Sequence, residues 1–189
     1  MMSTTPSDGP NRMIAIVLDD LVHDQVNLVR ALYDRGEVDA VPPHVPLIGP
    51  RPIAGSAGDL VDALRLLVGA YQPFVLTLSA PGRHFDGDRH LLQLYAGRGA
   101  DDARGLAGAI AGVLPLDPPE PPLRDDDGLT PAITVGRFDS ESDCDAAVGE
   151  LADRQYFVVV QQIALLEQRH DVWSIERTVK LGAIREGGA

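Results

Sequence analysis

Two short stretches far apart in the chain constrain the fold more than any other feature. Residues 43–50 read Pro-His-Val-Pro-Leu-Ile-Gly-Pro, and residues 131–138 read Pro-Ala-Ile-Thr-Val-Gly-Arg-Phe. Each begins with proline, alternates apolar and polar residues, and reaches a glycine, and an alternation of period two predicts a β-strand. Two related strands separated by 88 positions (132 − 44) predict a pseudo-symmetric fold with a cleft between its two halves.

The alternation also predicts which side chains of these strands lie together. His44 and Pro46 share one face of the first strand, and Ala132 and Thr134 share one face of the second. Proline cannot donate a hydrogen bond to a neighbouring strand, so the first strand must be bulged or lie at a sheet edge. We expect the two faces to line the cleft from opposite sides.

The rest of the chain alternates between strand-like and helix-like segments, and Asp86-Gly87 gives a strong hairpin signal. This order predicts an α+β fold, a single bilobal domain over 13–184, with two antiparallel sheets lining a central cleft and helices outside. We expect polar tails at 1–12 and 185–189, and a surface loop at 115–128. Further strands are expected at 13–18, 74–78, 90–95, 156–166 and 172–181, and helices near 22–33 (stopped by Gly36), 60–68, 106–113 and 144–151.

Charge and cysteine content limit the possible partners. The net charge of −12 argues against extended contact with nucleic acid, since such binding depends on Lys and Arg neutralising phosphates. It does not exclude a small phosphorylated ligand in one pocket. No apolar run approaches the roughly 20 residues of a membrane helix, and the N-terminus lacks the apolar core of a signal peptide. With a single cysteine, Cys144, the chain is expected to be cytoplasmic.

The paired strands, within this order of elements, resemble the 2H phosphoesterase superfamily. That superfamily includes bacterial 2′-5′ RNA ligase-like and cyclic phosphodiesterase proteins, which carry two copies of His-x-Thr/Ser-x, one per lobe. The resemblance runs from Ile14 to about Gly182 and includes the closing hairpin at 160–167 and 173–177. It implies that two imidazoles face each other across a phosphate, one neutral and one protonated, and open a 2′,3′-cyclic phosphate.

This sequence keeps half of each motif. His44 matches the first motif histidine, but Pro46 stands where Thr or Ser is expected. Thr134 matches the second hydroxyl, but Ala132 replaces the second histidine. The resemblance therefore implies His44 and Thr134 as catalytic residues, with Pro46 and Ala132 beside the ligand. A methyl or pyrrolidine group cannot move a proton, so weak or lost hydrolysis is expected.

Two functions remain open. The first is a diverged 2H protein that binds a nucleotide or small phosphorylated ligand in the cleft. The second is a non-catalytic module that keeps the fold for ligand sensing or protein contact. A polar, open pocket beside His44 would favour the first, and a cleft filled with apolar side chains would favour the second.

A second cluster of chemically active side chains surrounds the expected hairpin tip. His84, Asp86, Asp88 and His90 are metal-ligand types at alternating positions. Because Asp86-Gly87 turns the chain between them, His84 is expected opposite Arg89, and a polar tip is the simpler interpretation. No metal and no cofactor are expected. If the tip borders the pocket, His84 could supply the missing imidazole.

Overall fold

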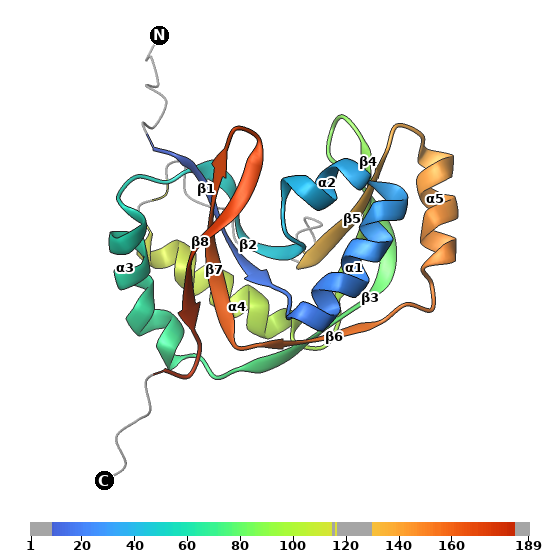
Figure 1. Cartoon of the computed structure of the whole chain (residues 1–189). Coiled ribbons are helices and arrows are strands. Elements are labelled where there is room, and N and C mark those ends of the chain that lie inside the picture. The colour runs from blue at the N-terminus through green and yellow to red at the C-terminus, as the bar shows by residue number, and fades with distance from the viewer. Residues whose placement is uncertain (1–8, 115, 117–129, 184–189) are drawn as a thin grey trace.

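The computed structural model describes residues 9–114, 116 and 130–183, and within them it contains two four-stranded antiparallel sheets (Figure 1). The first sheet has the order β2-β1-β7-β8, and the second has the order β5-β4-β3-β6. The expected α+β arrangement of two antiparallel sheets is confirmed. The strands of the first sheet are β1 Asn11–Val17, β2 His44–Pro52, β7 Gln162–Arg169 and β8 Val172–Lys180, and those of the second are β3 Phe74–Phe85, β4 His90–Ala96, β5 Ala132–Phe138 and β6 Tyr156–Val160.

Five helices in the described ranges pack on these sheets. They are α1 Asp20–Tyr33, α2 Arg35–Ala40, α3 Ala57–Ala70, α4 Ala100–Val113 and α5 Glu141–Glu150. Helices α3 and α4 contact each other and strands of the first sheet, whereas α1 and α5 contact strands of the second. In Figure 1, α3 and α5 lie at opposite sides of the molecule.

The helices begin where the sequence offers caps. The Asp19 carboxylate accepts from the Val22 amide, and Ser56 with Asp59 forms a complete capping box at the start of α3. The predicted stop at Gly36 is wrong. Helix α1 ends before Asp34, and Gly36 lies inside the short helix α2 that follows. That second helix brings the chain back toward β2.

Two of the predicted strands differ from the structure. The run at 156–166 is not one strand, because the chain leaves the second sheet after β6 and enters the first sheet at β7, with Gln161 between them. The strand expected at 74–78 continues to Phe85 past a bulge near Ala80, which has a φ of 51°. Both the break between β6 and β7 and the length of β3 depend on how these strands pair with their neighbours. The residue pattern of one strand does not specify that pairing.

The hairpin between β3 and β4 is present, but its register differs from the expected one. Phe85 pairs with His90, so the loop has four residues and His84 lies opposite Leu91, not Arg89. The Asp86 carboxylate accepts from two loop amides, those of Asp88 and Arg89, at 2.9 and 2.8 Å. These bonds lower the pKa of Asp86. The tip is a polar turn, as expected.

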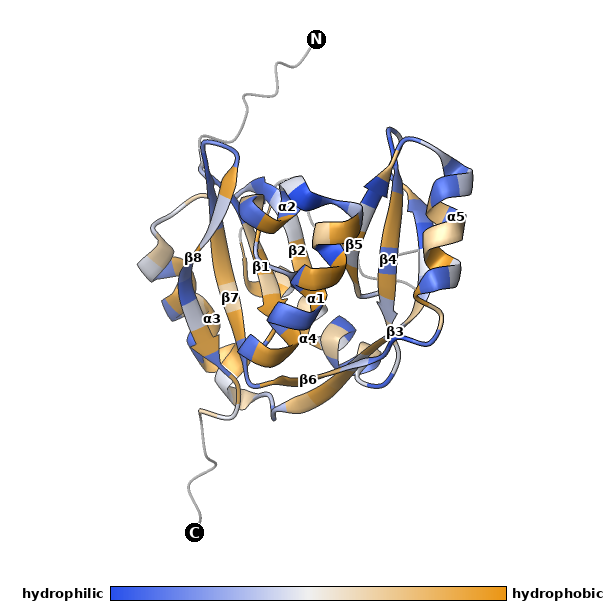
Figure 2. Cartoon of the chain, turned by 45° about the vertical axis from the view of Figure 1, so that its right-hand side comes forward, coloured by the Kyte–Doolittle hydropathy of each residue, from blue (hydrophilic) through white to orange (hydrophobic). Residues whose placement is uncertain are grey.

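The first sheet buries both of its faces, to different extents. Alternate β1 residues such as Ile14 and Ile16 point into the main core with α3 and α4. Met13 and Ala15 point to the other side and join a much smaller cluster of buried side chains. Hydrophobic residues dominate β7 and extend along β6 (Figure 2). The smaller cluster consists of Met13, Ala15, Val41, Ala164 and Leu166, with Val17 and Trp173 packed against it.

The first strand begins two residues before the expected start of the domain at residue 13. Strand β1 begins at Asn11, and the Arg12 side chain is buried, where it donates to the Ile53 carbonyl at 3.0 Å and forms an ion pair with Glu167 at 2.9 Å. The expected tail at 185–189 and nearly all of the expected loop at 115–128 lie outside the described residues. None of the helices in the described ranges is long and apolar enough to cross a membrane.

Candidate functional site

The two motif strands are edge strands of different sheets. Strand β2 lies at the edge of the first sheet and β5 at the edge of the second, and the two strands contact each other. Pro46 pairs with Ala15 immediately beside a register shift, and the other side of β2 has no strand partner among the described residues of its sheet. Pro46 therefore lies both at a sheet edge and beside an irregularity in the pairing, as expected for a proline in a strand.

A cavity of about 250 Å³ lies between these strands. All four motif residues line it: His44 and Pro46 from β2, and Ala132 and Thr134 from β5. Small-molecule sites usually enclose about 300–1,000 Å³, so this cavity suits one small ligand. The remaining lining residues are Met13, Arg30, Glu37, Ala40, Val41, Pro43, Pro50, Gln93, Arg137, Gln168, Asp171 and Trp173.

His44 is held in one orientation by the segment before β2. Its Nδ1 lies 2.8 Å from the Pro42 carbonyl oxygen, which can only accept, so Nδ1 carries the proton and Nε2 keeps its lone pair. Burial lowers the pKa of His44, the bond to Pro42 opposes the shift, and the nearby charge of Arg30 lowers it further. A neutral imidazole with Nε2 unprotonated can accept a proton from water or a hydroxyl.

Thr134 is oriented by the neighbouring strand. Gln93 on β4 donates from its amide Nε2 to Thr134 Oγ1 at 3.3 Å. Because that contact uses an oxygen lone pair, the hydroxyl proton of Thr134 remains available to a ligand oxygen. A hydroxyl held in place in this way can donate a hydrogen bond to an oxygen of a phosphoryl group.

The sequence analysis missed two arginines in the lining. Arg30 follows the apolar stripe residue Val29 on α1 and was not singled out, yet its side chain is almost fully buried. Strict alternation would place Arg137 on the same face as Ile133, away from Thr134. A register shift between Leu92 and Gln93 on the partner strand adds one residue to β5, which brings Arg137 to the cavity side.

Glu37 on α2 links these two arginines. Its carboxylate forms an ion pair with Arg137 and lies 3.7 Å from Arg30 Nη2. Arg30 also donates to the Glu37 carbonyl at 2.8 Å and to Asn27 at 2.9 Å. Burial lowers the pKa of Arg30, against the raising effect of Glu37. Arg137 also pairs with Asp34 at 3.2 Å, so two carboxylates balance the two guanidinium charges. This end of the cavity can therefore receive an anion through hydrogen bonds from guanidinium N–H groups, and not through net positive charge.

The other sequence candidates lie elsewhere. His84 does not line the cavity; it sits on β3 near the hairpin tip, and His90 packs against Phe85 there with ring centroids 5.0 Å apart. Among the described residues, no group of three or more His, Cys, Asp or Glu side chains is arranged to hold a metal ion. The lining therefore offers one imidazole, His44, as a general base.

The chain matches a model of a known family over most of its length. That family is described as the 2′-5′ RNA ligase superfamily, and the match covers residues 18–172. The chain belongs to this superfamily. The resemblance to 2H phosphoesterases that the motifs indicate is thus confirmed. A comparison with curated protein sequences finds no match.

Solved structures agree with the superfamily fold. TT0787 of Thermus thermophilus superposes with a TM-score of 0.59 at 16% identity, covering 93% of this chain and 100% of that one. E. coli LigT complexed with NADP+ gives 0.55 at 17% identity, covering 93% and 99%. LigT complexed with 3′-AMP gives 0.54 at 19% identity, covering 91% and 97%. At these identities the likeness establishes the fold.

Proposed function

We propose that the protein binds a nucleotide or small phosphorylated ligand in the cavity between its two sheets, with weak or lost hydrolysis of 2′,3′-cyclic phosphodiesters. One observation carries the proposal. His44 and Thr134, which come from different sheets, line a single open cavity together with two arginines. Structures of E. coli LigT complexed with phosphate and with 3′-AMP support the ligand class by analogy.

The expected weakness of turnover follows from Ala132. Opening a cyclic phosphate requires one group to take a proton from water and another to give a proton to the leaving oxygen. His44 can do the first with Nε2, but the Ala132 methyl group cannot do the second. Loss of one acid–base partner typically costs about 10²–10⁴-fold in rate. Glu37 and Asp171 are the carboxylates of the lining, and a carboxylate in its ionised form can accept a proton but has none to give to the leaving oxygen.

The decisive experiment compares activity and binding in the same protein. Purified wild type and His44→Ala are assayed with a nucleoside 2′,3′-cyclic phosphate, and binding of the corresponding monophosphate is measured by calorimetry. The expected result is slow or absent turnover, with binding that His44→Ala weakens. His23→Ala, on α1 and outside the cavity lining, is the control. Rapid turnover by wild type would contradict the weak-hydrolysis claim.

Restoring the motifs tests whether the site has simply lost a proton carrier. Ala132→His with Pro46→Thr recreates both copies of the family pattern. If no other residue has taken over the missing role, the double variant gains turnover. An active wild type whose rate does not change in the double variant would instead indicate a substitute acid or base. His84 is not expected in that role, because it is absent from the lining.

The alternative is a non-catalytic module that retains the fold for ligand sensing or protein contact. The cavity is open and lined by charged and polar groups, which favours a bound ligand over a purely structural role. The absence of both turnover and phosphate-ligand binding would leave protein contact as the better hypothesis. For either function we propose a cytoplasmic location, which the single cysteine, Cys144, supports.

A further inference from the structure

Strand β6 leaves one edge of the second sheet open. Among the described strands it pairs only with β3, at the end of the order β5-β4-β3-β6. Its sequence, Tyr-Phe-Val-Val-Val, contains neither proline nor a charged residue. An edge strand of this composition readily pairs with a strand of another chain unless some feature of the fold prevents it.

The other three edges of the two described sheets have such protection. Prolines interrupt β2, and β8 carries charged side chains at Glu176, Arg177 and Lys180. Strand β5 contacts β2 of the other sheet. Prolines, charges and covering elements are the usual means of preventing an edge strand from pairing. The open edge at β6 therefore indicates an interaction surface.

The backbone of β6 is oriented to accept a further strand. Thr77 on β3 donates its N–H to the Arg98 carbonyl and accepts from the Gly97 N–H, so its backbone groups point away from β6. Thr77 is the partner of Phe157, and alternate residue pairs of antiparallel strands exchange no hydrogen bonds. The N–H and C=O of Phe157, and by the same alternation those of Val159, therefore point to the open edge.

Exposed apolar side chains lie next to this edge. Phe157 and Val159 are 59% and 50% exposed, and they alternate with the buried residues of β6. Helix α1 presents a leucine face made of Leu21, Leu28 and Leu32, each at least 70% exposed. A groove of about 360 Å³ lies between this leucine face and the start of β6. A contiguous apolar surface of this kind marks a protein interaction site.

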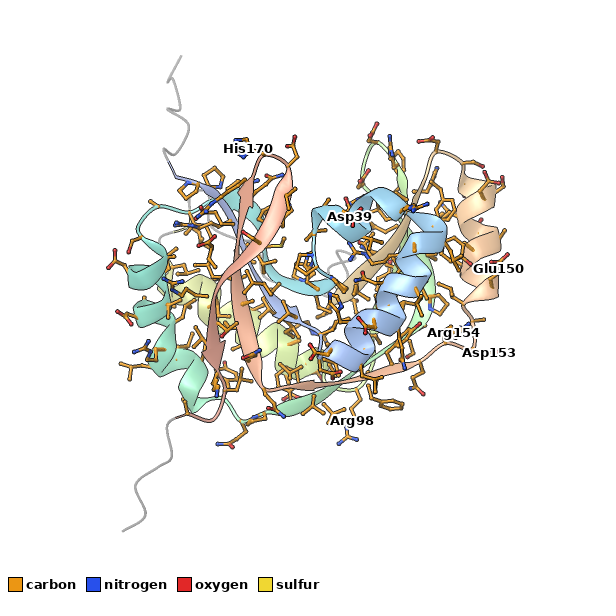
Figure 3. The ribbon with its side chains drawn as sticks, viewed as in Figure 1. Asp39, Arg98, Glu150, Asp153, Arg154 and His170 are labelled. Carbon is orange, nitrogen blue, oxygen red and sulfur yellow. The ribbon has the colours of Figure 1, made fainter. Side chains whose placement is uncertain are left out.

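The charges near β6 are of both signs. Figure 3 labels Arg154 beside the start of β6 and Arg98 below the strand. Both are exposed, and neither forms an ion pair with a residue that the structure describes. The exposed face of α1 carries Asp20 and Asp24 among its leucines. A two-fold contact can bring the guanidinium groups of each copy to carboxylates of the other, so the net charge of −12 does not prevent two copies from associating.

Strand β6 is complementary to a second copy of itself. When two copies pair antiparallel about Val158, Phe157 of each copy lies opposite Val159 of the other. Both residues direct their backbone groups to the edge, so each of these pairs exchanges two hydrogen bonds. An aromatic side chain beside a β-branched one is a favourable cross-strand pair. Gln155 then lies opposite Gln161, and no two like charges face each other over this length.

We propose that two copies of this chain form a two-fold dimer, in which their β6 strands pair antiparallel and join two four-stranded sheets into one. With five residues, β6 is about 17 Å long and by itself too small for a stable interface. The leucine face of α1, a helix of 14 residues and about 21 Å, supplies further apolar area. None of the exposed apolar residues of α1 and β6 lines the cavity between the sheets, so the dimer does not depend on the proposed ligand.

The first test measures the oligomeric state of the full chain. Sedimentation velocity at protein concentrations from about 1 to 500 µM covers the affinities of weak and of moderately strong interfaces. We expect dimers, with a fraction of monomer that grows on dilution. A chain that stays monomeric throughout would overturn the dimer and leave a strand of a different protein as the better occupant of the edge. Open-ended assembly would contradict a closed two-fold contact.

Two variants locate the interface, each with a matched control. Phe157→Lys places a charge beside the edge of β6, and Ile175→Lys places the same charge on β8, where Ile175 is 45% exposed. Leu28→Asp charges the leucine face of α1, and Leu66→Asp charges a leucine of α3 that is exposed to the same extent. The β6 and α1 variants should raise the dissociation constant of the dimer at least about 10-fold, and the controls should leave it unchanged. Thermal unfolding shows that each variant is folded, and equal effects within either pair would contradict the assigned surface.

Cross-linking tests the register without weakening the interface. Chains carrying Phe157→Cys and chains carrying Val159→Cys are mixed and oxidised, with wild type, whose Cys144 is buried, treated in parallel. Opposite residues that exchange hydrogen bonds have Cα atoms about 5.5 Å apart, within the range of about 4.4–6.8 Å that a disulfide spans. We expect a covalent dimer from the mixture and little from either variant alone. A mixture that gives no more covalent dimer than the single variants would overturn the register about Val158.

Discussion

At the scale of single residues, His44 shows how local contacts set chemical character. The Pro42 carbonyl fixes the proton on Nδ1, and burial keeps the ring neutral. The charged groups acting on it come from three elements: Arg30 on α1, Glu37 on α2 and Arg137 on β5. Their opposing signs leave burial as the dominant influence. His44 can therefore accept a proton at Nε2, but burial disfavours its charged form.

This leads to a prediction about stability and pH. Above about pH 6.5 the imidazole is neutral in both the folded and the unfolded chain. Below that pH the unfolded chain takes up a proton on His44 that the folded chain does not. The free energy of unfolding therefore decreases as the pH is lowered, by up to about 1.4 kcal/mol per pH unit. Chemical denaturation of wild type and His44→Gln between pH 5 and pH 8 measures this, and the variant should lack that part of the slope.

The control for the pH experiment is His23→Gln, which replaces a histidine of α1 that lies outside the cavity lining. The carboxylates are common to all three proteins, so the difference between the wild-type and His44→Gln curves reports His44 together with the groups that act on it, such as Glu37. Parallel curves for wild type and His44→Gln would show that burial does not disfavour the charged form of His44.

At the scale of secondary structure, a glycine outside the site determines how closely helix α4 packs against strand β3. Gly99 precedes α4 with a φ of 82°, a left-handed conformation that residues with a side chain rarely adopt. A Cβ atom there would lie 2.4 Å from the Val75 carbonyl oxygen on β3. That close approach packs the start of α4 against the second sheet, while the body of the helix reaches β2 of the first.

Replacing this glycine should therefore destabilise the fold. Gly99→Ala is expected to lower the free energy of unfolding by about 1–3 kcal/mol through backbone strain, and by more where the Cβ clash forces β3 to move. Gly108→Ala is the matched control, since that glycine lies in the middle of α4 with no atom near an added Cβ. It should instead stabilise by about 0.5–1 kcal/mol. Urea denaturation gives both values, and equal effects would contradict the argument.

At the scale of the whole molecule, the site exists because two sheets meet. Strand β2 brings His44 from the first sheet and β5 brings Thr134 from the second, and the passage from β6 to β7 at Gln161 connects the two sheets covalently. The cavity is small, and the chain carries a net charge of −12. Together these features favour one small ligand and disfavour a long nucleic acid.

The whole-molecule argument predicts how binding depends on ligand length and salt. A single-stranded RNA of about ten nucleotides should bind no more tightly than a mononucleotide. A plot of the logarithm of its affinity against the logarithm of the salt concentration should have a slope of about −1. Neutralising all of its phosphates would give a slope of about −7. Fluorescence anisotropy over a salt series measures both quantities. Affinity that increases with RNA length would contradict a one-ligand site.

Much of this protein can be predicted from local patterns in the sequence. Alternation of period two is enough to place His44 with Pro46 and Ala132 with Thr134, because successive side chains of a strand point to opposite faces. Caps such as Ser56 with Asp59 mark helix starts, because the first amides of a helix need acceptors close in sequence. The resemblance of the two motif strands to those of the 2H phosphoesterases indicates the fold.

Tertiary structure decided what local patterns do not contain. The bulge that turns Arg137 toward Thr134 depends on pairing with β4. The separation of β6 from β7 depends on their different partners, since β6 pairs with β3 and β7 pairs with β1 and β8. Arg30 enters the cavity because α2 folds back and supplies Glu37 as its counter-ion. Trp173 meets the motif strands only across the assembled first sheet. The partners in these contacts are not specified by a local sequence pattern, and they are fixed only when the chain packs.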